Sequence, residues 1–398
     1  MEKNYTIGVD LRVLAGGAYG GIAQYLLGLL PELFKIDRTI KFKLFFSAYK
    51  KRLPRYSWLE EENVRLFRFN YPNRLLFASS RIFNYPKLDN LVRGADVFFS
   101  PHFFSAPLSS GCRSVVTFHD LSFIRYPEFF SWRKNIWHRL EMNPRRQAQR
   151  ADKIIAVSES TRSDLISLFG VSDKKIEVIY SGVTGQAEGN TFLSADEKKY
   201  VHQSLAKESV RKKYNLPDNF FLFLGMLEPR KNILGILKAF VYLKSNKQIP
   251  TDSALVIAGP LGWLYADILK FHQESPFRGS IRFIGPVEEK DKPYLYLLSR
   301  VFVYPSFFEG FGFPPLEAMT AGVPVVTSVV SSLPEVAGEA ALLVNPFNVK
   351  EIAEAMKNLF LNEKLRDFYI RKGLERAKEF SWKKTAEETL QVLVESVG

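Results

Sequence analysis

The sequence contains one cysteine, Cys112, among its 398 residues. A single thiol excludes a disulfide framework within the chain, and it also excludes a zinc or redox site built on a CxxC pair. Such sparing use of cysteine is typical of proteins that work in a reducing compartment. We therefore expect a cytoplasmic protein.

Long apolar runs are also missing. The most apolar stretches, residues 220–227 and 254–266, are short or broken by glycine and proline, whereas a membrane-spanning helix needs about 18 or more apolar residues in a row. The first residues include Glu2 and Asp10 and contain no apolar core of a signal peptide. We expect neither a transmembrane segment nor a signal peptide.

Several catalytic signatures are absent as well. No aspartate is followed by a second one two positions later, although an Asp-x-Asp pair is a common way to hold a divalent metal on a nucleotide diphosphate. The patterns HExxH and GxSxG do not occur either. If the chain handles a diphosphate, cationic side chains and a helix terminus must supply the positive charge. We expect no metal and no other cofactor.

The charge is uneven along the chain. The net charge is +13, and residues 1–183 hold 28 lysines and arginines against 17 acids, whereas residues 184–398 hold 27 against 25. A basic excess of this kind attracts phosphates, anionic lipid surfaces or nucleic acid. Residues 126–150 add aromatic side chains beside cations, a composition typical of a membrane interface. The alternative for both features is an ordinary solvated surface.

Short apolar runs alternate with helical stretches in two series. The length suits two domains of about 150–200 residues each, and the alternation predicts two parallel, doubly wound α/β sheets. The first domain is predicted over residues 1–190 and the second over 205–380, joined by the polar segment 184–204. The expected strands are 6–10, 43–46, 64–67, 96–100, 114–118, 153–157 and 175–180, then 220–225, 254–259, 281–285, 301–305 and 323–327. Helices are expected over 22–34, 131–150, 351–362, 363–380 and 381–397.

The strongest motif runs from Glu309 to Glu317. It follows the predicted strand 301–305, and its two prolines suit the first turn of a helix. Gly310 and Gly312 let the backbone approach a ligand closely, and the two carboxylates can accept hydrogen bonds from sugar or ribose hydroxyls. The alternative for Glu317 alone is a favourable acid in a helix first turn.

Two further loops carry polar side chains after predicted strands. Arg230 and Lys231 precede a helix start, where two cations and the helix dipole suit a leaving diphosphate. His119 and its neighbour Asp120 end the run 114–118, so the imidazole is placed to donate a hydrogen bond near a reacting group. The alternatives are a surface pair and a structural histidine. The glycines at 16–21 open the first helix as a loop that allows close approach, although their spacing matches no dinucleotide or Walker signature.

These motifs together resemble family 4 of the retaining glycosyltransferases, which have the GT-B fold. The segment 304–327 closely matches the E-x7-E region of that family, and the segments 331–338, 156–161, 181–183 and 20–25 match as well. The resemblance covers nearly the whole chain, and it is closest to members that build lipopolysaccharide O-antigen and other cell-surface glycans. Two departures are Gln24 and Met226, each of which stands where the family often has arginine.

The resemblance implies roles for the matching positions. It implies that Glu309 contacts the donor sugar together with the amides of Gly310, Phe311 and Gly312, and that Glu317 holds the ribose. It implies that Arg230 and Lys231 bind the diphosphate and that Gly20 and Gly21 lie near the phosphates. It also implies that His119 lies beside the reacting sugar, with Asp120 on the acceptor side. It also implies that a last helix, about 381–398, packs back on the N-terminal domain. Front-face transfer with retention follows from the same resemblance.

The partners implied are a nucleotide sugar, with GDP-mannose first and a UDP-sugar or dTDP-rhamnose next, and a glycan or lipid-linked acceptor. The basic first half indicates possible contact with an anionic membrane surface at its inner face. A GT-B phosphorylase or epimerase is an alternative enzyme class. A basic nucleic-acid-binding protein is a third reading, but the chain has no recognised nucleic-acid motif, so we expect no nucleic-acid partner.

Overall fold

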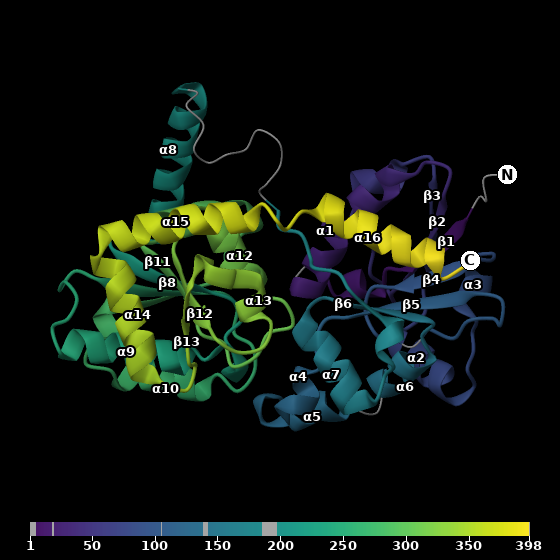
Figure 1. Cartoon of the computed structure of the whole chain (residues 1–398), viewed down its shortest axis with the longest axis horizontal. Helices are drawn as coiled ribbons and strands as arrows, with labels where there is room; N and C mark the ends of the chain where they lie inside the picture. The colour runs from purple at the N-terminus through teal and green to yellow at the C-terminus, as the bar shows by residue number, and fades with distance from the viewer. Residues whose placement is uncertain (1–4, 18–19, 105, 138–141, 185–196, 398) are drawn as a thin grey trace. The chain divides into compact units, whose positions relative to one another are not determined.

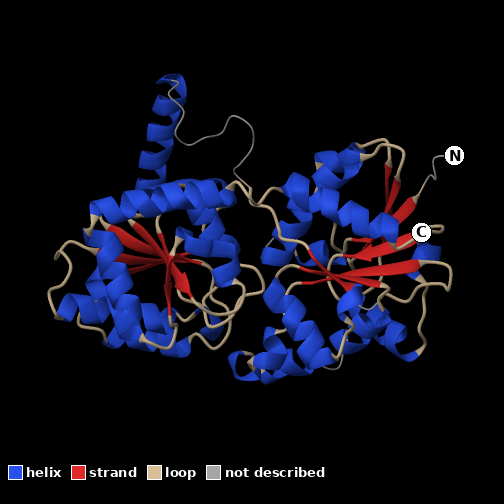
Figure 2. Ribbon diagram, viewed as in Figure 1, coloured by secondary structure: helices blue, strands red, loops and turns tan. Residues whose placement is uncertain are grey.

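The computed structural model describes residues 5–17, 20–104, 106–137, 142–184 and 197–397. The chain folds into two compact units, shown in Figure 1. Residues 1–125, 132–182 and 380–398 form the first unit, and residues 126–131 and 183–379 form the second. Figure 2 shows that each unit is a layer of strands with helices on both sides, which is the predicted α/β class.

The first unit contains a seven-stranded parallel sheet of order β3-β2-β1-β4-β5-β6-β7. Its strands are β1 Thr6–Asp10, β2 Lys41–Ser47, β3 Val64–Phe69, β4 Val97–Ser100, β5 Arg113–Phe118, β6 Lys153–Ala156 and β7 Ile176–Val178. Its α-helices are α1 Gly21–Ile36, α2 Asn73–Ile82, α3 Leu88–Leu91, α4 Ser122–Arg125, α5 Trp132–Ile136, α6 Pro144–Arg150, α7 Glu159–Phe169 and α16 Trp382–Glu395. The middle strand of the sheet, β4, is buried along its whole length, as expected for a strand covered on both faces.

The second unit contains a six-stranded parallel sheet of order β10-β9-β8-β11-β12-β13. Its strands are β8 Phe220–Leu224, β9 Ala254–Ala258, β10 Ile281–Gly285, β11 Val301–Tyr304, β12 Val325–Ser328 and β13 Leu342–Val344. Its α-helices are α8 Glu197–Lys213, α9 Ile233–Ser245, α10 Ala266–Glu274, α11 Lys292–Leu298, α12 Phe313–Thr320, α13 Leu333–Ala337, α14 Val349–Leu361 and α15 Glu363–Ala377.

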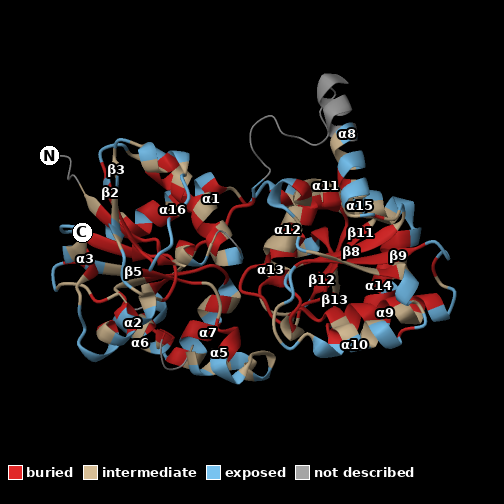
Figure 3. Ribbon diagram, turned by 180° about the vertical axis from the view of Figure 1, so that it is seen from behind, coloured by how far each residue is buried: buried red, intermediate tan, exposed pale blue. Residues whose placement is uncertain are grey.

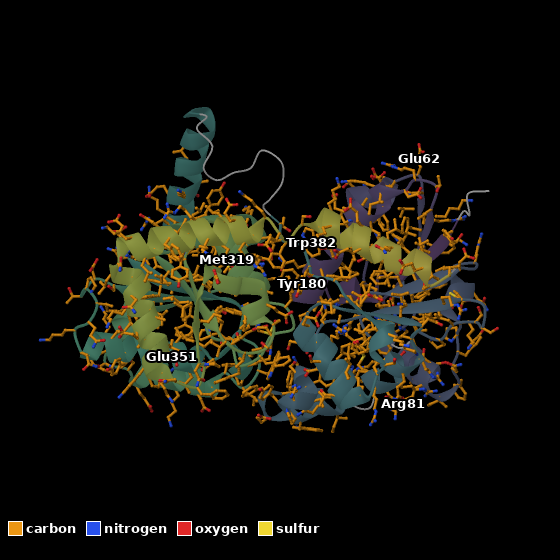
Figure 4. All side chains as sticks on the ribbon, in the orientation of Figure 1. Glu62, Arg81, Tyr180, Met319, Glu351 and Trp382 are labelled. Atoms are coloured by element: carbon orange, nitrogen blue, oxygen red, sulfur yellow. The ribbon has the colours of Figure 1, made fainter. Side chains whose placement is uncertain are left out.

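The last helix, α16, returns to the first unit, as the resemblance implied. Thr385 Oγ1 donates a hydrogen bond of 2.8 Å to the carbonyl of Tyr180, near the Trp382 side chain (Figure 4). The Trp382 ring lies directly over Gly28 of α1, where an added Cβ would come within 2.1 Å of the indole. A glycine is therefore required for this close packing of α1 and α16.

Three elements differ from the predictions. The single helix expected over 131–150 is two helices, α5 and α6, because Pro144 begins α6 and Asn143 caps it. The strand β13 was not predicted. The polar connection 184–204 lies mostly outside the described residues, but its last part belongs to α8. In the described part of the chain, no helix combines the length and apolar character needed to cross a bilayer.

The strand order determines where ligands can bind in each unit. The order in which successive strands are added to the sheet reverses between β1 and β4 in the first unit and between β8 and β11 in the second, while all strands stay parallel. At such a switch point the loops after two adjacent strands separate and leave a crevice at their carboxyl ends. The motifs predicted after β8 and β11 therefore meet at one edge of one sheet.

Candidate functional site

The loop after β8 is shaped by a short 3-10 turn, Pro229–Lys231, followed by Asn232. Asn232 adopts a left-handed conformation (φ 55°) and stands directly before α9. Its buried amide donates hydrogen bonds to the carbonyls of Pro305 at 3.0 Å and Pro346 at 2.7 Å. These bonds tie the β8 loop to the loop after β11 and fix the direction of the two preceding cations.

The loop after β11 is held by two serines of the segment that precedes α13. Ser331 Oγ accepts a hydrogen bond from the amide of Glu309 at 2.9 Å. Ser332 Oγ lies 2.9 Å from the Glu309 carbonyl and 2.7 Å from the Phe311 carbonyl. Gly312 precedes α12 with φ 116°, a conformation that favours glycine. The predicted motif thus has a fixed backbone course.

The predicted cations and the predicted acid form one ion cluster. Arg230 Nη1 lies 2.7 Å from Glu309 Oε2, and Lys231 Nζ lies 2.6 Å from Glu309 Oε1. Arg230 Nη1 also donates to the carbonyl of Phe308 at 2.6 Å. Each carboxylate oxygen of Glu309 therefore accepts from a different cation, and the structure brings together three residues that the sequence predicts in two separate motifs.

Two members of the cluster were missed by the sequence analysis. Glu228 is 2% exposed, and its Oε1 lies 2.7 Å from Arg230 Nη2. Tyr304, the last residue of β11, accepts a hydrogen bond of 2.5 Å at its hydroxyl from Lys231 Nζ. Glu228 had one sequence signal, an acid two positions before an arginine in a strand-to-helix loop. With Glu228 included, two cations face two carboxylates.

Burial and charge act against each other in this cluster. Burial alone would raise the pKa of Glu309, but the charges of Arg230 and Lys231 and their hydrogen bonds outweigh it and hold the pKa at about 2. Burial, followed by the charge of Arg230, lowers the pKa of Lys231. Burial, followed by the charge of Glu309, raises the pKa of Tyr304 well above its ordinary value. Glu309 is a carboxylate at every physiological pH.

Glu317 lies in the first turns of α12, where the sequence analysis placed it. Its Oε2 accepts a 2.8 Å hydrogen bond from the hydroxyl of Tyr296, a buried residue of α11. Burial and the nearby Glu317 charge raise the pKa of Tyr296 well above its ordinary value, so the phenol is the donor. The ion pairs of the cluster join Arg230 and Lys231 to Glu228 and Glu309, and Glu317 lies on the neighbouring helix α12 beside Tyr296.

Aromatic side chains pack beside the Glu309 loop. Tyr126 and Phe129 come from the short segment that belongs to the second unit, and their rings lie 5.7 Å from Phe308 and 5.3 Å from Phe307 respectively. Trp263 Nε1 donates a 2.6 Å hydrogen bond to the Phe129 carbonyl. The residues just before Glu309 are therefore supported by apolar packing from a distant part of the sequence.

His119 belongs to the first unit and directly follows β5. Its Nε2 lies 2.8 Å from the Pro101 carbonyl, which can only accept, so Nε2 carries the proton. The Tyr25 ring packs edge-on against the imidazole at 5.0 Å, and Thr161 Oγ1 donates to the His119 carbonyl at 3.2 Å. His119 is therefore held by the Pro101 carbonyl, by Tyr25 of α1 and by Thr161 of α7.

Burial lowers the pKa of His119 to about 4, although the Pro101 hydrogen bond and Asp120 oppose the shift. The imidazole is therefore neutral at pH 7. Its one N–H already donates to Pro101, so the remaining ring nitrogen, Nδ1, is an acceptor. The sequence predicts a donor at this ring, whereas in the structure the free ring nitrogen is an acceptor.

The other predicted residues of the first unit lie at the carboxyl edge of its sheet. Gly20 precedes α1 with φ 93°, and Gly21 begins the helix. Residues 18 and 19 of the glycine-rich loop lie outside the described residues. Asp120 Oδ1 accepts from the amide of Ser122 at 3.0 Å and from its hydroxyl at 2.7 Å, so it shapes the turn into α4.

The comparisons with known proteins agree with this architecture. The model described as "Glycosyl transferases group 1" matches residues 206–376, and the model described as "Glycosyltransferase Family 4" matches residues 19–184. The chain is 31% identical over 379 residues to O-antigen chain mannosyltransferase B of Escherichia coli, covering 93% of this chain and 94% of the relative. The chain belongs to the group 1 glycosyl transferases. The Arg230–Glu309 cluster lies within the matched region of this glycosyltransferase.

Solved structures show the same GT-B fold as this glycosyltransferase. Sucrose-phosphate synthase from Thermosynechococcus elongatus matches with a TM-score of 0.74 and 19% identity, covering 98% of this chain and 99% of that one. HepE of Anabaena in complex with UDP and glucose matches with a TM-score of 0.68 and 19% identity, covering 98% of this chain and all of that one (100%). The predicted fold class is confirmed.

Proposed function

We propose that this glycosyltransferase transfers mannose from GDP-mannose to a glycan or lipid-linked acceptor in the synthesis of a cell-surface polysaccharide, with retention at the anomeric carbon. A relative that matches over nearly the whole chain is an O-antigen chain mannosyltransferase. Retention rests on the resemblance to the retaining family. A UDP-sugar and dTDP-rhamnose are the next donors to test.

The observation that carries the proposal is the cluster of Arg230, Lys231 and Glu309 at the β8–β11 switch point. A diphosphate leaving group develops negative charge as its bond to the sugar breaks, and nearby preorganised cations stabilise that charge. Arginine grips phosphate oxygens with two N–H groups, and lysine adds a point charge. Both cations are already held in place by Glu228 and Glu309, so the cations themselves need little reorganisation during reaction.

The proposed reaction uses these groups in one displacement. The bond between the anomeric carbon and the diphosphate oxygen breaks, and the electron pair stays on the diphosphate beside Arg230 and Lys231. The acceptor hydroxyl forms the new bond on the same face, and its proton passes to the departing phosphate oxygen. No enzyme nucleophile and no metal is assigned a step, and the absence of a metal requirement stays a prediction.

The remaining predicted residues bind the donor in this proposal. Glu309 and the backbone of Gly310, Phe311 and Gly312 contact the sugar, and Glu317, held by Tyr296, accepts from the ribose hydroxyls. The proposed contact of His119 with the sugar uses its Nδ1 as an acceptor from a sugar hydroxyl. Gly20 and Gly21 are proposed to lie near the phosphates.

The test is a thermal-shift panel of GDP, UDP, ADP and dTDP, each with and without magnesium. A nucleotide at about a hundred times its dissociation constant adds roughly 2.7 kcal/mol to stability. We expect GDP to raise Tm without metal, and Lys231→Ala to abolish the shift. Lys238→Ala is the matched control, because Lys238 is exposed on the adjacent helix α9. If Lys238→Ala weakens the shift as much as Lys231→Ala, the assigned site is wrong.

Other outcomes discriminate the alternatives. A shift by UDP or dTDP alone reassigns the donor, and the anomeric configuration of the product, read by NMR, tests retention. If no nucleotide shifts Tm, the nucleotide-sugar proposal fails. A pyridoxal phosphate absorbance band would then indicate a phosphorylase, and salt-dependent oligonucleotide binding would indicate a nucleic-acid-binding protein.

We also propose that the protein is cytoplasmic and associates with the inner face of the membrane. The basic excess of residues 1–183 supports this proposal, since the cytoplasmic leaflet is anionic and attracts lysine and arginine. Sedimentation with anionic and with neutral vesicles tests it directly. Equal binding to both kinds of vesicle, or to neither, contradicts the electrostatic basis.

A further inference from the structure

A cavity of about 270 Å³ lies at the amino edge of the first unit's sheet. Its wall includes Cys112 and Ser114 at the start of β5 and Asp152 just before β6, together with residues of α2 and α6. Figures 1 and 3 show these two helices beside each other from opposite sides. His119 follows the other end of β5, and six strand residues span roughly 20 Å. The cavity is thus separate from His119.

Three arginines surround this cavity: Arg81 at the end of α2, and Arg146 and Arg150 on α6. Among the described residues, no carboxylate forms an ion pair with any of the three. The one acid in the described lining, Asp152, is held by Arg113 Nη1 at 3.1 Å and by the amide of Ser114 at 2.8 Å. The cavity therefore has a net positive wall.

The wall of the cavity also contains a buried hydroxyl without a hydrogen-bond partner in the described structure. Ser80 is 4% exposed, and within the described structure its Oγ has no hydrogen-bond partner. A buried hydroxyl without a partner costs free energy, so it is normally satisfied by a ligand or water. The lining adds the side-chain amides of Asn84 and Gln147. Guanidinium, hydroxyl and amide donors around one space are the chemistry that recognises a phosphate group.

The rim of the cavity on the α2 side is apolar and exposed. Ile82 is 70% exposed, Phe83 73% and Tyr85 64%, and they directly follow or interleave with the lining residues Arg81 and Asn84. Large apolar side chains that are exposed close together mark interaction surfaces more often than isolated ones do. An apolar surface next to cations is typical of helices that lie in the interface of an anionic membrane.

We propose that this cavity binds the phosphate of an anionic lipid headgroup, while Ile82, Phe83 and Tyr85 enter the membrane interface. Figure 4 labels Arg81, a lining residue of the cavity, at the bottom of the first unit in that view. The inference rests on the proposed membrane association and names its site, and it is independent of the donor nucleotide. The occupant is a lipid because the polar pocket and the apolar rim adjoin, which a soluble phosphate would not require.

The test compares two arginines of the same helix in the full-length protein. Arg146 lines the cavity, whereas its neighbour Arg145 is exposed and does not. The probe is sedimentation with vesicles of phosphatidylglycerol and phosphatidylcholine in equal parts. Arg145→Gln removes one charge near the surface and should cost about fivefold in vesicle affinity. Arg146→Gln also removes the proposed charge-assisted hydrogen bonds to the lipid phosphate, so its loss of vesicle affinity should be roughly tenfold larger than that of Arg145→Gln.

Two further arms separate the possible sources of phosphate. Ile82→Ser with Phe83→Ser should abolish vesicle binding, and glycerol 3-phosphate should still raise Tm in this variant but not in Arg146→Gln. Equal losses for Arg145→Gln and Arg146→Gln indicate a diffuse basic surface and overturn the proposal. A shift by glycerol 3-phosphate without any vesicle binding indicates a soluble ligand and overturns the lipid assignment. The GDP shift of the second unit is measured in parallel, so failure here and failure of the proposed donor remain distinct.

Discussion

The ion cluster around Glu309 gives a quantitative prediction. Glu309 is 6% exposed, and its pKa is held at about 2, whereas the ordinary value is 4.5. A folded-state pKa depressed by this much contributes about 3 kcal/mol of stability at neutral pH. Breaking a buried ion pair by removing one partner costs about 3–5 kcal/mol. We therefore expect Glu309→Gln to lower the free energy of unfolding of the second unit by about 3 kcal/mol at pH 7.

The assay is urea unfolding followed by hydrogen exchange of the amides in β8 and β11, which report on the second unit. Glu339→Gln is the matched control, because its partner is Lys372 at 3.0 Å and its side chain is 90% exposed. A pair exposed to this extent is worth less than about 1 kcal/mol. If both substitutions cost the same, the argument from burial is wrong.

The pH dependence tests the same reasoning from the opposite direction. Because the folded-state pKa of Glu309 is depressed, its contribution is present above pH 4.5 and disappears as pH falls toward 2. The difference between wild type and Glu309→Gln should shrink over that interval. A difference that stays constant down to pH 2 would refute the assignment of the stability to the carboxylate charge.

The effect on ligands follows from the charge that remains. Without the Glu309 carboxylate, Arg230 and Lys231 have less compensating charge, so GDP should raise Tm at least as much as in the wild type. Sugar transfer should nevertheless be lost, because the proposed contact to the sugar is gone. Loss of both GDP binding and transfer would show instead that Glu309 is needed to position the cations.

Three further predictions concern other parts of the chain. Gly28→Ala should lower the free energy of unfolding by about 1–3 kcal/mol through overpacking, because the added Cβ would lie 2.1 Å from the Trp382 ring. Amide hydrogen exchange in α16 should become faster, and unchanged exchange would contradict this prediction. His119 has a folded-state pKa of about 4, whereas its ordinary pKa is 6.5. The unfolded chain therefore binds more protons between these two pH values, and the free energy of unfolding of the first unit should fall by about 3 kcal/mol as pH falls from 6.5 to 4. In urea unfolding, His119→Gln should remove this part of the pH dependence. Tyr296→Phe removes the hydrogen bond to Glu317 and should weaken GDP binding about tenfold, measured by calorimetry; an unchanged affinity would exclude a role for Glu317 orientation.

Much of the fold could be predicted because buried parallel strands are continuous apolar runs. The run Phe220–Leu224 is β8, and the run Val301–Tyr304 is β11, within one residue of the expected ends. The strand β13, Leu342–Val344, escaped because three residues at the sheet edge carry too little pattern. The break before α6 had a readable signal, the Asn143-Pro144 pair, which the apolar and basic periodicity of the flanking residues obscured.

The site could be predicted in its parts but not in its assembly. Arg230 and Lys231 were assigned to a diphosphate and Glu309 to a sugar from separate motifs, and a sequence does not state that β8 and β11 are neighbours in the sheet. The direct pairing of Glu309 with both cations therefore could not be foreseen. Glu228 was overlooked for a similar reason, because an acid acquires its meaning only when its guanidinium partner is known.

The pairing changes how the two cations should be understood. Arg230 and Lys231 alone carry two formal positive charges, and the carboxylates of Glu228 and Glu309 balance them in the cluster. The two carboxylates hold the cations in place and reduce the attraction of the cluster for other anions in solution. In the proposed reaction, a departing diphosphate competes with a carboxylate for the two cations. Glu309 is the better candidate to yield, because within the described structure it accepts from both cations, whereas Glu228 accepts from Arg230. Under the proposed mechanism, the carboxylate that contacts the sugar also controls how much positive charge the leaving group meets, which couples recognition of the sugar to stabilisation of the diphosphate.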